Sequence, residues 1–267
     1  MHLFVTGVVA LIYSASSLAE LYGPVFDEDV KKFRRGLNAA DNKEVEETLV
    51  RIRWAGITDP RIYDPIVESL KTEKLATEKQ KAYVQAIVFS GNAQYLPFLK
   101  DLVSKKVGKK ASRITAKKYL KFFSDQQKIA EYMARGLSEA KTNEELWARR
   151  YENGLNYALD REKFRWAARD LYLNARSDAS FRVAEAFLKS KTNEEVSDEY
   201  EIDAIAFLCK ALGLSRRPEY TDTLKALAEN TPVKKIFEYA ERSVQYHEPD
   251  YKVSHTRFKT SNPRFKR

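Results

Sequence analysis

Apolar positions recur at helical spacing along most of the chain. Ile62, Ile66 and Leu70 fall at steps of four, which places them on one face of a helix. Asp59 can accept hydrogen bonds from the free N–H groups of the first turn, and Pro60 suits the first helical position, since the donor it lacks would have no partner there. The pattern predicts a helix that begins after Asp59 and buries one side.

The next segment is apolar on more than one side, which is typical of a helix packed between others. We expect it to begin at Thr77, because Thr77 and Gln80 have the spacing of a capping box. It should end at Gly91, because glycine accepts the left-handed conformation that follows a helix end. Two further helices are expected over residues 95–103 and 111–123. The residues expected to face inward on the second of these are Ala111, Ile114, Tyr119, Phe122 and Phe123.

Helical spacing continues on both sides of this stretch. A helix is expected from about Asp27, and Asp41 with Glu44 should open the next. We expect this pair to cap one end of an array of helices, where one face must meet water. Later helices are expected over residues 129–137, 147–158, 164–171, 181–188, 200–213 and 218–244.

Parts of the sequence repeat. The set Ser90, Tyr95, Leu99, Lys100 and Leu102 recurs at the same internal spacing as Ser215, Tyr220, Leu224, Lys225 and Leu227. The pentapeptide KTNEE occurs at residues 141–145 and again at 191–195. Each copy contains a Thr-x-x-Glu capping box, so each is predicted to start a helix. Repeated helical units of this kind indicate a solenoid.

Several segments resemble HEAT repeats. ITDPRIYDPIVESL and SGNAQYLPFLKDLV resemble their first helices, with a proline after a short apolar lead, and ALGLSRRPEYTDTLKALAE resembles the bacterial form. PVKKIFEYAERSV and KKASRITAKKYL resemble second helices, with a small residue inside, Ala240 and Ala116. The resemblance is clearest over residues 59–123 and 204–246. It implies an armadillo-like helical superhelix that is non-catalytic and binds other proteins.

Composition agrees with one soluble all-α body. The chain has 267 residues, of which 43% are hydrophobic and 32% charged, with only nine glycines and eight prolines. The fold class expected is therefore all-α, and the resemblance to HEAT repeats implies a right-handed α-α superhelix of about six antiparallel helix pairs over residues 20–246.

The N-terminus resembles an export signal. Residues 1–19 contain no Lys, Arg, Asp or Glu, and a short apolar run precedes the small residues Ser17 and Ala19. Cleavage is predicted before Glu20, which would place the protein in a periplasm or outside the cell. The run is short for a membrane span, which needs roughly 20 apolar residues. An uncleaved anchor and a buried first helix remain alternatives.

The formal net charge of +9 permits attraction to anionic partners such as nucleic acid, lipid head groups or acidic proteins. Arginines gather in the middle of the sequence near Trp147 and Trp166. They could line a groove for an acidic or extended peptide. The alternative is a core of aromatic residues with solvated arginines that pair with nearby carboxylates. The arginines selected as candidates are Arg149, Arg150, Arg165 and Arg169.

Residues 247–267 form a basic C-terminal segment without helical periodicity. Basic and aromatic side chains alternate there, which suits a membrane surface, a nucleic acid or an acidic partner. The alternative is a solvated tail or a strap lying back along the solenoid. The candidate contact residues in this segment are Arg257, Phe258, Lys259, Arg264, Phe265 and Lys266.

Chemistry-bearing motifs are scarce. His247 and His255 have no second histidine or cysteine at ligand spacing, so no metal site is expected. The sequence has no G-x-S-x-G motif and no Gly-rich phosphate loop, so neither a serine hydrolase nor a nucleotide cofactor is expected. Cys209, the single cysteine, lies in an apolar helix and is expected to be a buried, unreactive residue.

The sequence therefore predicts an exported, non-catalytic HEAT-like scaffold that binds another protein along its helical surface and needs no cofactor. The alternative is a basic module that binds an anionic polymer, lipid head groups or nucleic acid. A third possibility is a helical enzyme with a carboxylate site.

Overall fold

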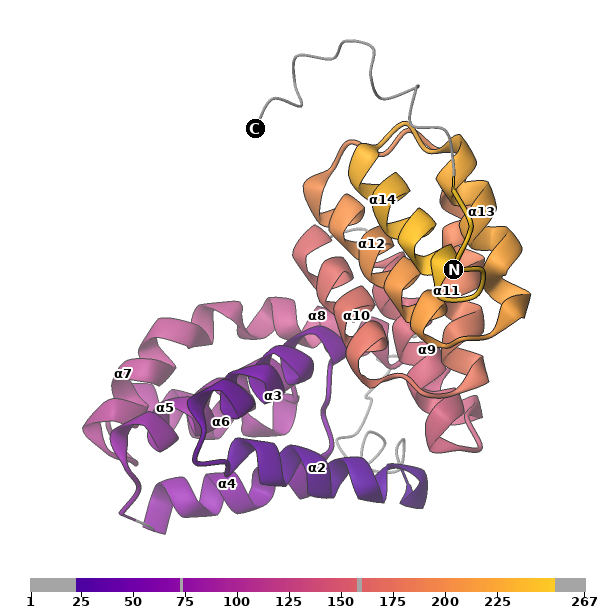
Figure 1. The fold of residues 1–267 in the computed structure, drawn as a ribbon. Helices are drawn as coiled ribbons and strands as arrows, with labels where there is room; N and C mark the ends of the chain where they lie inside the picture. The colour runs from indigo at the N-terminus through magenta and orange to yellow at the C-terminus, as the bar shows by residue number, and fades with distance from the viewer. Residues whose placement is uncertain (1–22, 73, 158–159, 253–267) are drawn as a thin grey trace, which may run out of the picture.

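The computed structural model describes residues 23–72, 74–157 and 160–252, and within these ranges the chain forms helices and no strand (Figure 1). The all-α expectation is confirmed. The α-helices are α2 (Asp27–Leu37), α3 (Asn42–Ala55), α4 (Pro60–Thr72), α5 (Thr77–Ser90), α6 (Leu96–Val103), α7 (Lys110–Tyr119), α8 (Phe123–Met133), α9 (Asn143–Asn156), α10 (Arg161–Asn174), α11 (Asp178–Lys191), α12 (Glu199–Leu214), α13 (Thr221–Asn230) and α14 (Lys234–Gln245).

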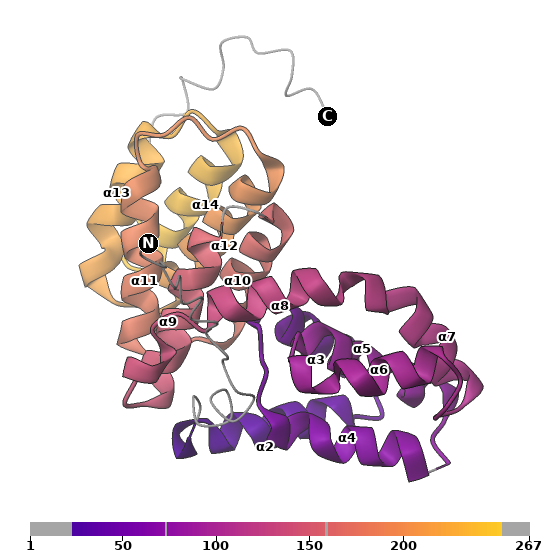
Figure 2. The same cartoon turned by 180° about the vertical axis from the view of Figure 1, so that it is seen from behind.

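The helices form two lobes, α2–α7 and α9–α14, with α8 running between them (Figures 1 and 2). In the first lobe α3, α5 and α7 lie side by side, and α2, α4 and α6 pack against them. In the second lobe α10, α12 and α14 form one row, called here the second row. Helices α9, α11 and α13 form the first row behind it. None of the described helices is long and apolar enough to cross a membrane.

The helices do not stack in chain order. After α7 the chain returns through α8, which packs against α5 and α3, and α9 and α10 then also pack against α3. Helix α3 therefore lies between α5 and α10, at the place where the two lobes meet. The prediction that the first helix pair caps one end of the array is wrong, because the buried side chains of Ile52 and Trp54 are covered by helices of both lobes.

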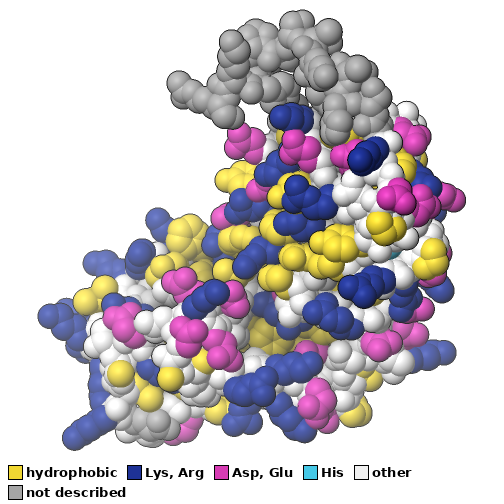
Figure 3. All heavy atoms as spheres, viewed as in Figure 1, with side chains coloured by type: hydrophobic (Ala, Val, Ile, Leu, Met, Phe, Trp, Pro, Cys, Tyr) yellow, Lys and Arg dark blue, Asp and Glu magenta, His cyan; other side chains and the backbone are white. Residues whose placement is uncertain are grey.

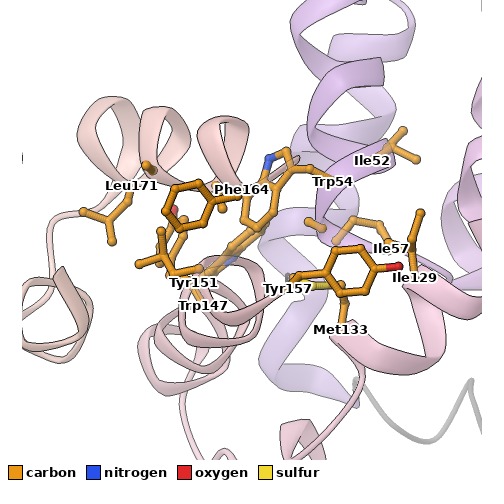
Figure 4. Packing of buried hydrophobic residues seen from close by; sticks show 14 of the residues in the cluster. Ile52, Trp54, Ile57, Ile129, Met133, Trp147, Tyr151, Tyr157, Phe164 and Leu171 are labelled. Carbon is orange, nitrogen blue, oxygen red and sulfur yellow. The ribbon is translucent and has the colours of Figure 1, made fainter. Parts of the chain in front are cut away.

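Aromatic packing joins the lobes (Figure 4). The Trp54 ring from α3 stacks on Tyr151 of α9 with centroids 5.8 Å apart, and Trp147 lies 6.3 Å from Trp54. Trp54 is only 2% exposed. A side chain at Gly154 would bring a Cβ within 2.7 Å of the Ala167 Cβ and 3.2 Å of the Trp54 ring, so the helices approach closely only because residue 154 is glycine.

Buried polar groups also bridge α3 to the second lobe. The Arg51 guanidinium lies 3.3 Å from the Asp170 carboxylate, which also accepts hydrogen bonds of 2.9 Å from the Tyr151 hydroxyl and from Asn174. Burial raises the pKa of Asp170, and the nearby Arg51 charge opposes that rise. Because both partners are enclosed at the junction, their geometry fixes how α3 meets α10.

Helix α2 is attached to the second lobe through Asp29. Its carboxylate is 2% exposed and accepts hydrogen bonds from the Trp147 indole at 2.7 Å and from Asn143 at 2.6 Å. No sequence pattern predicts these contacts, because α2 and α9 are far apart in the chain.

The two copies of KTNEE have different structures. Thr142 caps α9, since its hydroxyl accepts a hydrogen bond of 3.2 Å from the Glu145 backbone. Thr192 instead follows the last residue of α11, and its hydroxyl donates to the Leu188 carbonyl. The prediction of a helix start there is wrong, because Asp198 caps α12 several residues later.

This difference predicts unequal effects of one substitution. Thr142→Ala should lower the free energy of unfolding by about 1 kcal/mol, because it removes a cap. Thr192→Ala should lower it by less than about 0.5 kcal/mol, because no helix begins there. Urea unfolding followed by circular dichroism measures both. Equal losses in the two variants would contradict the assignment of the caps.

Two other local predictions fail. Helix α5 begins at Thr77 as expected, but the capping box is absent: no side chain caps its N-terminus, and Gln80 instead donates to the Leu75 carbonyl at 2.8 Å. Ile114 is 59% exposed and Phe122 39% exposed, so neither faces inward as expected. Phe122 lies in the 3-10 turn that follows α7, which breaks the helical spacing. Within α7 the buried side is formed by Ser112, Thr115 and Ala116, and Ile114 lies outside it.

The described part of the C-terminal segment is attached to the second lobe. The His247 ring makes contacts of 2.8 Å to the Thr221 hydroxyl and 3.1 Å to the Gly213 carbonyl, and Glu248 pairs with Lys225 at 2.7 Å. Residues 247–252 thus lie against the helices, as in the strap alternative. The predicted signal at 1–19 and the contact residues Arg257, Phe258, Lys259, Arg264, Phe265 and Lys266 lie outside the described residues.

Candidate protein-binding surface

The second row exposes a surface in which cations and aromatic rings alternate. Side chains three or four residues apart on α10, α12 and α14 point to the same side. Figure 3 shows Lys and Arg side chains among hydrophobic ones over these helices. We call this side the second-row face. Its side chains are those of Arg165, Trp166, Arg169, Tyr172, Leu173, Asp203, Phe207, Lys210, Leu214, Lys235, Tyr239, Arg242 and Tyr246.

Charged side chains align the helices near their N-terminal ends. Asp203 of α12 lies between Arg165 of α10, at 3.4 Å, and Lys235 of α14, with which it also forms an ion pair. The Arg165 guanidinium lies 4.9 Å from the Tyr200 ring as well. These bridges show that the three helices run in parallel, with their starts at one edge of the face.

Aromatic side chains occupy the middle of the face. The Tyr172 and Phe207 rings stack with centroids 5.9 Å apart and planes 28° apart. The Lys210 ammonium lies 5.5 Å from each of these rings and 4.5 Å from the Tyr239 ring. One cation is therefore surrounded by rings from α10, α12 and α14.

The far edge of the face is apolar. Leu173, Leu214 and Tyr246 lie at or just beyond the C-terminal ends of the three helices and are 42%, 48% and 48% exposed. A cavity of about 380 Å³ opens between the ends of α10 and α12, with Tyr172 and Leu214 in its lining. Exposed apolar side chains beside a cavity are typical of surfaces that bind another protein.

The structure separates the four arginines chosen from the sequence. Arg165 and Arg169 lie on the second-row face, where Arg169 is 3.8 Å from Glu47 of α3. Arg149 lies on α9 and pairs with Glu152. Arg150 is completely buried, with its guanidinium 5.2 Å from the Phe26 ring and 5.4 Å from the Trp147 ring. Arg150 therefore stabilises the lobe junction and offers no surface to a partner.

The alternative interpretation of this region was an aromatic core with arginines paired to carboxylates. Much of the observed structure agrees with it. Trp147 and Tyr157 are buried, and the arginines do pair with acids. Arg149 pairs with Glu152 of its own helix. Arg165 and Arg169 pair instead with residues on other helices, which periodicity within one segment cannot reveal.

Sequence reasoning missed the centre of the surface. Phe207, Lys210 and Leu214 share a side of α12 opposite the buried Cys209. They recur at helical spacing, but the stronger pattern in this segment is the apolar side that holds Cys209. Burial of the Cys209 thiol raises its pKa, which agrees with the expected unreactive role.

The described residues contain no group of three His, Cys, Asp or Glu side chains placed to hold a metal ion. A cavity of about 580 Å³ lies between α9, α10, α11 and α12. Its lining includes three cations, of which Arg161 and Lys191 both pair with Glu201, at 3.5 and 3.0 Å, and Arg182 is the third.

Comparisons of the chain with protein-family models, with curated proteins and with solved structures found no match. The geometry of the second-row face is therefore the basis for a functional proposal.

Proposed function

We propose that this protein is a HEAT-like α-solenoid scaffold that is non-catalytic, is exported from the cytoplasm, and binds another protein on its second-row face. The observation that carries the proposal is the half-exposed apolar edge formed by Leu173, Leu214 and Tyr246 beside the aromatic centre of that face. Side chains from three helices contribute to one surface, so binding would be spread over several repeats.

Two features support a protein partner over a purely anionic one. On the second-row face Arg165 and Lys235 already share the Asp203 carboxylate, so these two cations offer less charge to a polyanion. The face also presents apolar side chains, whose burial supplies most of the free energy in protein association. The alternative, a basic module for anionic polymer, lipid or nucleic acid, rests on the net charge of +9 and on the basic residues 257–266.

Crosslinking capture from an extracellular fraction of the native host tests the proposal. The chain beginning at Glu20 is compared with a Leu214→Ser/Tyr246→Ser variant and with an Ile114→Ser/Phe122→Ser control, whose targets are also exposed apolar residues but lie away from the second lobe. We expect one protein to be captured at low and high salt. The Leu214→Ser/Tyr246→Ser variant should capture at least about tenfold less of it, and the control variant should capture as much as the unmodified chain.

The alternative predicts a different outcome. If only anionic polymer or lipid is recovered, and recovery disappears at high salt, the scaffold proposal is wrong. A shortened chain should end at Lys252, because Tyr251 still contacts the helices through its carbonyl and Gln245. Loss of capture in this shortened chain would assign binding to residues 253–267.

A further inference from the structure

Lys210 differs from the other cations of the second-row face in what surrounds it. Its ammonium lies within 5.5 Å of the Tyr172, Phe207 and Tyr239 ring centroids. Within the described ranges no carboxylate oxygen lies within 4.0 Å of that ammonium. In contrast, Arg165 and Lys235 share Asp203, and Arg169 is close to Glu47. Among the described residues Arg242 also has no carboxylate oxygen within 4.0 Å, but its guanidinium lies near a single ring, 5.9 Å from that of Tyr239.

The rings hold the ammonium in place without neutralising it. Cation–π contacts attract the charge to the ring faces, but they do not provide hydrogen-bond acceptors for all three N–H donors of an ammonium group. Lys210 is only partly buried, so the remaining donors reach the surface of the face. A carboxylate placed there would form charge-assisted hydrogen bonds, and little side-chain freedom would be lost because the rings already restrict Lys210.

The side chains around Lys210 indicate which groups should flank the carboxylate in such a ligand. Leu214 lies one helical turn further along α12, and Tyr246 is exposed at the same edge of the face. An apolar side chain next to the carboxylate would cover them. Adjacent helices are spaced roughly 10 Å apart, so the three helices span about 20 Å, which corresponds to about six residues of extended chain.

We propose that Lys210 is the anchor for an Asp or Glu side chain in a short segment of a partner protein, and that this segment carries an apolar or aromatic residue next to the acid and crosses α10, α12 and α14. The inference rests on the proposed function and adds the chemistry of the partner. At the other edge Arg165 and Lys235 are already paired with Asp203, so one acid at Lys210 flanked by apolar residues fits better than a polyanion.

Selection from a displayed library of random dodecapeptides tests this directly. The immobilised chain beginning at Glu20 is the target, and affinities of the enriched peptides are measured by fluorescence anisotropy. Each peptide is measured against wild type, Lys210→Met and Lys189→Met. Methionine preserves the unbranched stem over the rings. Lys189 is the matched control, since it is an exposed lysine on α11 in the first row.

We expect enriched peptides to contain Asp or Glu beside an apolar or aromatic residue. They should bind Lys210→Met at least about tenfold more weakly than wild type, as expected for loss of a hydrogen bond between charged groups. Lys189→Met should bind them as wild type does. Replacement of the acid by its amide in the peptide should give a loss of similar size in wild type and none in Lys210→Met.

Other results would overturn the inference. Peptides that lack acids, or that bind Lys210→Met and wild type equally, would show that Lys210 is not the anchor. If the same peptides lost affinity for Leu214→Ser/Tyr246→Ser, the protein-binding function of the face would still stand. Failure to enrich any peptide would count against the inference. So would binding of a single-stranded oligonucleotide that is lost in Lys210→Met, because the ligand would then be a polyanion.

Discussion

Trp54→Ala is expected to lower the free energy of unfolding by about 3–5 kcal/mol. The indole is 2% exposed and contacts Tyr151 and Trp147, so its removal leaves a cavity between α3 and α9. Gly154 permits the close approach of the helices but cannot fill the space. The ring belongs to one lobe and its neighbours to the other. We therefore also expect the two lobes of the Trp54→Ala variant to unfold at different urea concentrations.

Urea unfolding followed by circular dichroism and by tryptophan fluorescence measures this effect. Phe122→Ala is the matched control, because Phe122 is also a large aromatic residue but is 39% exposed, and it should cost about 1 kcal/mol or less. Similar losses in the two variants would show that Trp54 does not join the lobes.

Asp170→Ala is expected to destabilise the protein by about 3–5 kcal/mol, because it leaves the buried Arg51 guanidinium without its carboxylate. The Tyr151 hydroxyl and Asn174 would also lose an acceptor. Burial raises the pKa of Asp170 even though Arg51 lies beside it, so the ionised carboxylate is not fully compensated in the fold. The pair therefore fixes geometry more than it adds net stability.

The double variant Arg51→Met/Asp170→Leu tests this reasoning. Replacing both charges with apolar side chains should cost less than Asp170→Ala alone, since no buried charge is left without a partner. Thermal unfolding of wild type, Arg51→Met, Asp170→Leu and the double variant completes a mutant cycle. A double variant that is as unstable as the sum of the two single variants would contradict the coupling of Arg51 with Asp170.

Local signals predicted much of the secondary structure. Asp59 accepts a hydrogen bond from the Arg61 backbone at 2.9 Å, Gly91 has the left-handed conformation, and α4 begins at Pro60 as expected. These features depend on a few neighbouring residues, so spacing alone reveals them. Thr142 and Thr192 mark the limit, because identical pentapeptides cap a helix in one place and follow one in the other.

The arrangement of helices was harder to predict. Nothing in the periodicity of residues 123–133 shows that α8 turns back to α3, because an amphipathic pattern states that one face is buried but not against what. Arg150 shows the same limit at one residue. Charge suggests a surface role, but the guanidinium is buried beside the Trp147 ring of its own helix and the Phe26 ring from a distant part of the chain.

The candidate surface was predicted only in part. Arg165 and Arg169 were chosen for the right helix, whereas Phe207, Lys210 and Tyr239 were not chosen at all. Their significance comes from the contact of three helices, and Lys210 meets Tyr172 and Tyr239 only after α10, α12 and α14 are placed side by side. A sequence without aligned relatives contains no record of such contacts.

Site-specific photo-crosslinking in the native host is the most direct test of protein binding by the second-row face. A photoreactive phenylalanine analogue is placed at Leu214 or Tyr246, and at Ile114 as an equally exposed position outside the second lobe. We predict that both second-row positions crosslink to the same protein and that position 114 does not. Crosslinks from position 114 alone, or crosslinks only to lipid or nucleic acid from positions 214 and 246, would contradict the account.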